Sequence, residues 1–270
     1  MAEEGAERLE HGTRDFAGLS TSRLELRPVS PSVLCVRRRR YLSASYIVHD
    51  ADGVVLIDTG MEPDGSDMLA GLSAVGATVK DVTAILLTHW HNDHSSGTET
   101  IRRASGATVY YHEEEAPNFR HTAVSDWRRK LSDALPEHGP ISALKALVGQ
   151  SPPQPIAQAT TIVGGELLEG RFRALHTPGH CRGHTSYLYE PESVVFAGDA
   201  IAVCFERLWF MSRFLTDDLQ QARESMRRVA ELDVTAFCPG HRGPLLDPAG
   251  EERAAILEYL GSGKRWPWLS

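Results

Sequence analysis

The segment "THWHNDHSSG" at residues 88–97 gathers His89, His91, Asp93 and His94 directly after the apolar run "TAILL". Such a run is typical of a buried strand. Clustered imidazoles and a carboxylate are costly to bury unless they find partners. Neutral imidazole nitrogens and carboxylate oxygens are preferred ligands of Zn²⁺ and neighbouring divalent metals. The segment therefore predicts a metal site.

The spacing within this segment suggests which of the candidate ligands point toward the same place. His89 and His91 are two residues apart, so on an extended chain they project to the same side. Asp93 and His94 follow where the chain is expected to turn into a helix beginning at "SSGTETIRR". One loop could thus supply two ligand pairs to two neighbouring points.

Three more candidates lie in glycine-containing turns beside predicted strands: His180 in "TPGH", Asp199 in "AGDA" and His241 in "CPGH". Turns at strand ends are where sites are commonly assembled. The four cysteines, by contrast, are widely separated and form no CxxC pair. Neither a disulfide framework nor a thiolate zinc site is expected.

The elements that must position these residues follow from the apolar pattern. Short β-branched runs predict strands between "RLELRPV" and "GVVLIDTG", with a hairpin at the Asp-Gly of "HDADGVV". A helix is expected over 67–77 and another from Thr216 to Leu232, and a second series of strands runs from "ATTIVG" to "VTAFCPG". Strands followed by helices, twice over, predict two packed sheets with helices outside.

The expected domain organisation is simple. Residues 1–22 are polar and aperiodic and predict a tail, 23–262 form the folded domain, and 263–270 form a C-terminal tail. Within the domain, residues 113–158 are a partly helical insert ending in "SPPQP". It is too short for a core of its own, so we expect it to cap a site.

Charge and composition limit the classes of molecule that the chain is expected to bind. The chain of 270 residues has a formal net charge of −8, which argues against nucleic acid as a partner. The run "RRRR" at 37–40 is expected on a solvated strand face or in a turn rather than in a binding site. No stretch reaches the roughly 18 apolar residues of a membrane span. Because the start "MAEEGAERLE" lacks signal-peptide features, a cytoplasmic location is expected.

Taken together, the motifs resemble those of metallo-β-lactamase-fold hydrolases. The matching segments are the HxHxDH motif at His89 to His94, "TPGH", "GD", "PGH" and "IDTG" with Asp58, in the family's order over roughly residues 24–247. The resemblance implies an α/β fold with four layers, αββα, in which two mixed sheets are covered by outer helices.

The resemblance also implies a ligand set. His89, His91 and His180 would hold one metal, Asp93, His94 and His241 the second, and Asp199 would bridge them. Two Zn²⁺ ions per chain are expected, with Fe or Mn as alternatives. A position remains between them for a hydroxide nucleophile, with Asp93 as the catalytic proton acceptor. Asp58 and His184 would orient ligand imidazoles, although a purely structural role for His184 is equally open.

Within the family that the chain resembles, Asp199 is similar to an aspartate of lactonases, glyoxalase-II-like thioesterases and nucleases that the lactamases themselves generally lack, so the resemblance implies the glyoxalase-II-like and lactonase-like branch. The expected reaction is hydrolysis of a small ester, lactone or thioester. Trp209 and Phe210 are candidates for the substrate pocket, with core packing as the alternative. The alternatives left open are a metal-dependent endoribonuclease or phosphodiesterase, a β-lactamase, an iron persulfide dioxygenase and a metal-holding protein without catalysis.

Overall fold

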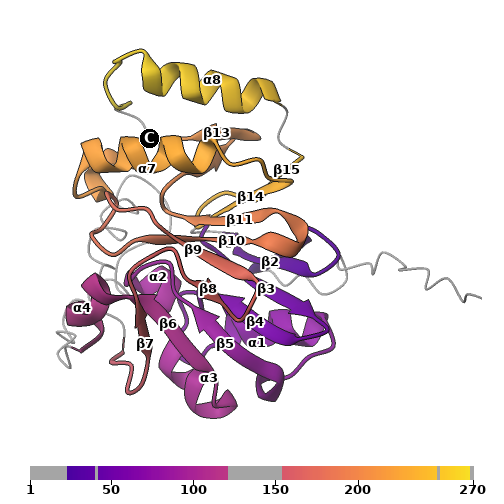
Figure 1. Ribbon diagram of the computed structural model, residues 1–270. Coiled ribbons are helices and arrows are strands. Elements are labelled where there is room, and N and C mark those ends of the chain that lie inside the picture. The colour runs from indigo at the N-terminus through magenta and orange to yellow at the C-terminus, as the bar shows by residue number, and fades with distance from the viewer. Residues whose placement is uncertain (1–22, 40–41, 121–153, 248–249, 268–270) are drawn as a thin grey trace, which may run out of the picture.

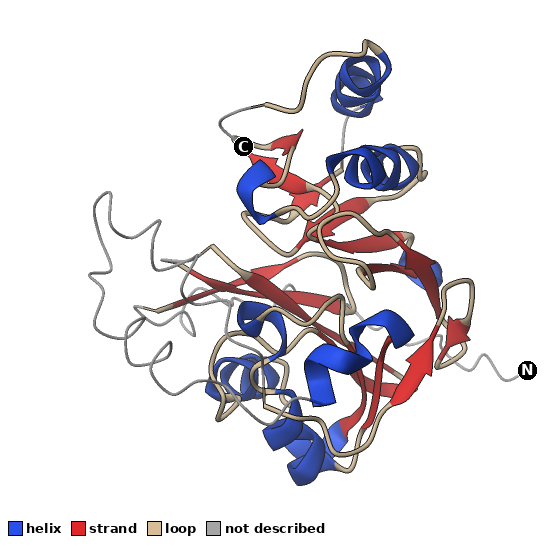
Figure 2. Cartoon of the chain, turned by 90° about the vertical axis from the view of Figure 1, so that its left-hand side faces the viewer, coloured by secondary structure: helices blue, strands red, loops and turns tan. Residues whose placement is uncertain are grey.

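Two sheets face each other at the centre of the molecule, and helices cover their outer faces (Figures 1 and 2). The computed structural model describes residues 23–39, 42–120, 154–247 and 250–267. The predicted four-layer αββα arrangement is confirmed. Of the predicted insert, residues 121–153 lie outside the described residues, as does the predicted tail at 1–22.

The first sheet has seven strands in sequence order and carries helices on one face. The strands are β1 (Leu24–Pro28), β2 (Val33–Arg38), β3 (Ala44–Asp50), β4 (Gly53–Ile57), β5 (Val82–Leu86), β6 (Thr108–His112) and β7 (Thr160–Ile162). The predicted hairpin is confirmed, because Asp50 of β3 pairs with Gly53 of β4. The helices on the outer face of this first sheet are α1 (Ser66–Ala74) and α3 (Thr98–Ser105). Helix α4 (Ala116–Arg120) comes after β6 in the chain.

The second sheet has six strands in the order β15-β14-β11-β10-β9-β8. They are β8 (Leu167–Leu168), β9 (Phe172–His176), β10 (Thr185–Tyr189), β11 (Val194–Gly198), β14 (Ala236–Pro239) and β15 (Leu245–Leu246). β8 and β9 form a hairpin, because Glu169 and Gly170 have positive φ and turn the chain back. Its outer helices are α7 (Leu219–Ala230) and α8 (Gly250–Gly261). A separate hairpin, β12 (Ala202–Cys204) and β13 (Arg207–Trp209), lies beside α8.

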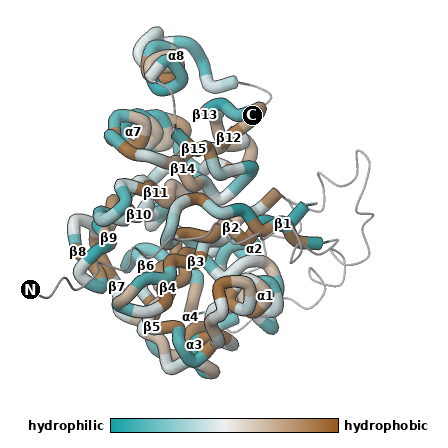
Figure 3. Tube along the Cα trace, turned by 90° about the vertical axis from the view of Figure 1, so that its right-hand side faces the viewer, coloured by the Kyte–Doolittle hydropathy of each residue, from teal (hydrophilic) through white to brown (hydrophobic). Residues whose placement is uncertain are grey.

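Strand periodicity explains the layers. In β2, Leu34 and Val36 pack toward the outer helices, whereas Val33 and Cys35 pack between the two sheets. In β11, alternate residues divide in the same way between the inter-sheet core and the cluster under α7 and α8. Strands buried on both faces read as continuous apolar runs, and these hydrophobic segments are brown in Figure 3.

The packed domain extends past its predicted end at residue 262. Trp266 is buried in the cluster under α7 and α8, and its indole N–H donates to the Met211 carbonyl at 2.9 Å. Part of the predicted C-terminal tail therefore belongs to the core. Within the described residues, none of the helices has the length and apolar character needed to cross a membrane.

The parallel ladders place several strand ends at one edge. β4, β5 and β6 run parallel in the first sheet, and β11 and β14 run parallel in the second. Two buried tyrosines tie these ends across the sheets: Tyr187 of β10 donates to the Leu87 carbonyl, and Tyr46 of β3 donates to the Pro239 carbonyl, each at 2.7 Å. The turns that follow β5, β11 and β14 therefore meet.

Candidate metal centre

The six-residue ligand segment begins where β5 ends and continues into a short helix. The helix expected to begin at Ser95 is two helices: α2 (Asn92–Ser95) begins three residues earlier and carries Asp93 and His94, and α3 begins at Thr98, after Gly97. The hydroxyls of Ser95 and Ser96 donate to the carbonyls of His91 and Asn92, where α2 ends. The segment from β5 into the single turn of α2 thus positions these four candidate ligands.

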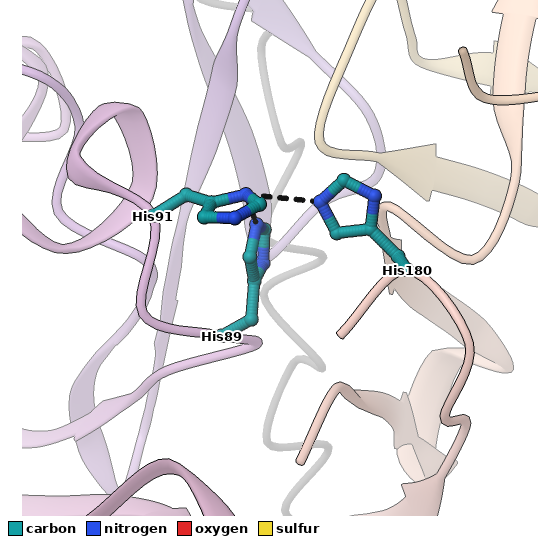
Figure 4. Close-up of side chains that lie close together, drawn as sticks. All are labelled: His89, His91 and His180. Atoms are coloured by element: carbon teal, nitrogen blue, oxygen red, sulfur yellow. Dashed lines mark hydrogen bonds between the residues drawn. The ribbon is translucent and has the colours of Figure 1, made fainter. Parts of the chain in front are cut away.

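Three imidazoles converge on one point from two segments of the chain (Figure 4). The Nδ1 atom of His91 lies 3.0 Å from Nε2 of His89 and 3.0 Å from Nε2 of His180. A single nitrogen can donate its proton to only one of these neighbours. Nitrogen ligands at about 2.0 to 2.1 Å from a tetrahedral zinc ion are themselves about 3.3 Å apart, so this spacing fits a metal.

The same three side chains are held in the neutral form that binds metals. Burial lowers the pKa of His91 to about 4. Burial, together with the surrounding histidines, also lowers the pKa values of His89 and His180 well below their usual value. Neutral imidazoles keep a lone pair available for a cation.

A second group consists of Asp93, His94 and His241. The Oδ2 atom of Asp93 lies 3.4 Å from Nε2 of His241 and 3.7 Å from Nε2 of His94. Burial opposes protonation of His94, but the carboxylates of Asp93, Asp199 and Asp58 raise its pKa to about 10. This point in the structure therefore favours a positive charge.

Asp199 lies between the two groups. Its Oδ2 atom is 3.2 Å from Nε2 of His180 and 3.5 Å from Nε2 of His241, and its Oδ1 atom is 3.6 Å from Nε2 of His94. Both Oδ1 of Asp199 and Nε2 of His94 are buried and have no hydrogen-bond partner among the described residues. Unpaired buried polar atoms are costly, and a shared cation would satisfy both. The seven candidates thus come together, and their nitrogen and oxygen atoms fit divalent metal ions.

Asp58 fixes two of these imidazoles, one directly and one through a threonine. Its Oδ2 atom accepts hydrogen bonds from Nδ1 of His94 at 2.9 Å and from the hydroxyl of Thr88 at 2.8 Å. Because the single O–H donor of Thr88 is used in the bond to Asp58, the Thr88 oxygen accepts a hydrogen bond from Nδ1 of His89 at 3.0 Å. In both histidines Nε2 is left to face the cluster.

His184 has a different partner from the one expected. Its Nε2 atom accepts the backbone N–H of Asp199 at 2.8 Å, and its Nδ1 atom lies 2.8 Å from the hydroxyl of Thr177. Burial lowers the pKa of His184 to about 3, which leaves a neutral acceptor. His184 therefore orients the aspartate main chain rather than a ligand imidazole. Neither Thr88 nor Thr177 was identified from the sequence, since a threonine before or after a strand is too common to stand out.

The aromatic pocket candidates lie on the β12–β13 side of the molecule. Phe210 is buried, and its ring packs against Tyr259 and Trp266. This is the core-packing alternative considered for it. Trp209 is 38% exposed and lies nearly perpendicular to the Phe210 ring, so of the two only Trp209 offers surface to a ligand.

Comparison with known proteins agrees with this geometry. The family model described as the metallo-beta-lactamase superfamily matches residues 38–241. The chain belongs to this superfamily. A crystal structure of a metallo-beta-lactamase family protein from Thermus thermophilus superposes with a TM-score of 0.60 at 26% identity, covering 87% of this chain and 81% of that one.

Two relatives of the chain in this superfamily have names that state a reaction. A hydroxyacylglutathione hydrolase from Bradyrhizobium sp. is 30% identical and covers 58% of this chain and 47% of its own length. An atrochrysone carboxyl ACP thioesterase from Aspergillus terreus is 27% identical and covers 82% of this chain and 59% of its own length. The chain spans about half the length of the curated relatives it matches first.

Proposed function

We propose that the chain is a hydrolase that binds two divalent metal ions, principally zinc, and cleaves a thioester or a related small ester or lactone. The observation that carries this proposal is the position of Asp199, whose carboxylate faces His180 on one side and His94 and His241 on the other. A carboxylate shared between two ligand groups is suited to holding two metals at once. The thioester is preferred because the two relatives above are named for thioester substrates.

The bound metals would polarise the substrate carbonyl and lower the pKa of a water molecule held beside it. The chain supplies the remaining functions. Asp93 is the partly exposed carboxylate of the cluster, with 23% of its side chain accessible. In the proposed reaction, Asp93 would accept the proton of the attacking water and pass it to the leaving group. His180 and His89 are buried and serve as ligands rather than as proton carriers.

The first prediction concerns metal content. Protein purified without chelator is expected to contain close to two metal ions per chain, mainly zinc, because the ligands are nitrogen and oxygen atoms without a thiolate. Elemental analysis on protein of known concentration measures this. A single tightly bound iron without zinc would contradict the proposal and favour the dioxygenase alternative.

The substrate class is tested on the same preparation. A panel should contain S-lactoylglutathione, an acyl thioester of N-acetylcysteamine, a γ-lactone, a chromogenic β-lactam and a single-stranded RNA. The thioesters are expected to give the highest kcat/KM. Cleavage of the RNA alone would overturn the proposal in favour of an endoribonuclease.

A second prediction concerns Asp58. The two carboxylate oxygens of Asp58 accept three hydrogen bonds, two from Thr88 and one from His94. Asp58→Asn keeps the shape of the side chain but leaves only one oxygen to accept them. Loss of such an orienting carboxylate typically weakens metal binding by roughly ten- to hundredfold. Competition with a chromophoric chelator measures the affinity. The matched control is Asp50→Asn, because Asp50 also accepts hydrogen bonds from neighbouring side chains, Arg171 and Tyr189, but contacts no ligand. Equal affinities in the two variants would refute the role of Asp58.

A further inference from the structure

A buried glutamate outside the ligand set lies directly behind the first group of histidines. Glu115 ends the short 3-10 helix η3 (Glu113–Glu115), which follows β6 at the start of the predicted insert. It is 1% exposed, whereas Glu113 and Glu114 beside it are exposed. A buried carboxylate without a basic partner is costly unless several donors surround it. Its donors therefore indicate why it is there.

Those donors come from both segments that carry the first group. The Oε1 atom accepts the backbone N–H of Gly183 at 2.8 Å. The side-chain amide of Asn118 donates to Oε2 at 3.4 Å. Burial raises the pKa of Glu115, and the nearby backbone N–H of Trp90 and thiol of Cys181 oppose that rise. Trp90 stands between His89 and His91, and Cys181 directly follows His180. The Glu115 carboxylate thus lies against both the His89–His91 segment and the His180 segment, which a metal bound by these three histidines would also join.

Glu115 packs so closely against Gly183 that a larger residue would not fit at that position. A Cβ atom added there would lie 2.6 Å from Cγ and 2.7 Å from Oε1 of Glu115, which is closer than non-bonded atoms approach. Gly183 has no positive φ that would itself require glycine. The glycine is therefore explained by the close approach of the glutamate rather than by backbone conformation.

We propose that Glu115 is a positioning residue that holds the His89–His91 segment and the His180 segment at the spacing that a metal bound by these three histidines requires. The inference rests on the proposed metal site. Without the carboxylate, the N–H group of Gly183 would be buried without its acceptor, and the two segments would lose one of the contacts that join them.

The test compares metal affinity and thermal stability in four proteins: the wild type, Glu115→Gln, Gly183→Ala and Glu99→Gln. Glu115→Gln should bind one of its two zinc ions roughly tenfold or more weakly and leave the other unchanged, as measured by competition with a chromophoric chelator. Gly183→Ala should give the same selective loss, since its methyl group displaces the carboxylate. Substitution with Co²⁺ should show an altered visible spectrum for the weakened position only.

Glu99 is the matched control for burial and location. It is 3% exposed, and it accepts the backbone N–H of Ala157 at the other end of the insert, together with hydrogen bonds from Arg102 and Arg103. Glu99→Gln should lower the Tm of the metal-free and metal-loaded forms alike and leave both affinities unchanged. In Glu115→Gln, the difference in Tm between the two forms should shrink.

The outcomes separate the two proposals. A wild-type protein that binds no zinc would overturn the proposed function and this inference together. Two zinc ions bound with wild-type affinity in both Glu115→Gln and Gly183→Ala would overturn the inference alone. So would Tm values of Glu115→Gln that fell in parallel for the two forms, as expected for Glu99→Gln.

Discussion

Asp93→Asn is expected to retain at least one metal and to lose roughly a hundredfold or more in kcat, which corresponds to about 2.7 kcal/mol of transition-state stabilisation. The carboxylate is proposed both to bind the second metal and to accept a proton, and an amide has neither the charge nor the basicity. Its Oδ2 atom lies between His241 and His94, so an asparagine fits the same space.

Turnover and metal content must be measured on the same preparation to separate the two roles of Asp93. His89→Ala is the contrasting variant, because it should mainly empty the first metal position. Asp217→Asn is the matched control, since it removes a carboxylate on the segment bonded to the His180 carbonyl without touching a ligand side chain. Near-normal kcat in Asp93→Asn at full occupancy would mean that the proton travels through another group.

Removal of the metals is expected to lower the Tm by on the order of 5 to 15 °C. Without a cation, Nε2 of His94 and Oδ1 of Asp199 have no hydrogen-bond partner among the described residues, and three carboxylates surround His94. A ligand that binds only the folded state stabilises it by about 4.1 kcal/mol when present at 1,000 times its Kd.

Calorimetry of the chelator-treated and metal-reconstituted protein measures this difference in Tm. His89→Ala treated in the same way serves as the control and should show a smaller change, because it begins with fewer bound ions. An unchanged Tm in protein shown to be free of metal would mean that the cluster is stable by itself.

The sequence was most informative where a function depends on neighbouring residues. The spacing of His89, His91, Asp93 and His94 was enough to predict that one segment brings several candidate ligands together, and the structure places all four in groups that could hold a metal ion. The layers were equally predictable, because strands followed by helices occur twice along the chain. Glycine-containing turns indicated where His180, Asp199 and His241 would lie.

Contacts between distant segments could not be predicted in the same way. The partner of His184 is a backbone N–H that reaches it only when β10 and β11 pair. Glu115 looks from the sequence like any acid in the run "HEEE", and its burial depends on a loop 68 residues away. The buried position of Trp266 likewise depends on the β12–β13 hairpin side of the molecule, which no local pattern connects to the C-terminus.

The ligand side chains are divided along the chain, with four before residue 95 and three from residue 180 onward. During synthesis from the N-terminus, the first four leave the ribosome long before their counterparts. An early ion could meet only part of either group, and Asp199 would not yet be present to join them. Under the proposed function, loading of both metals would therefore follow synthesis of His241 and closure of the two sheets, so that complete metal uptake would mark the end of folding rather than its beginning.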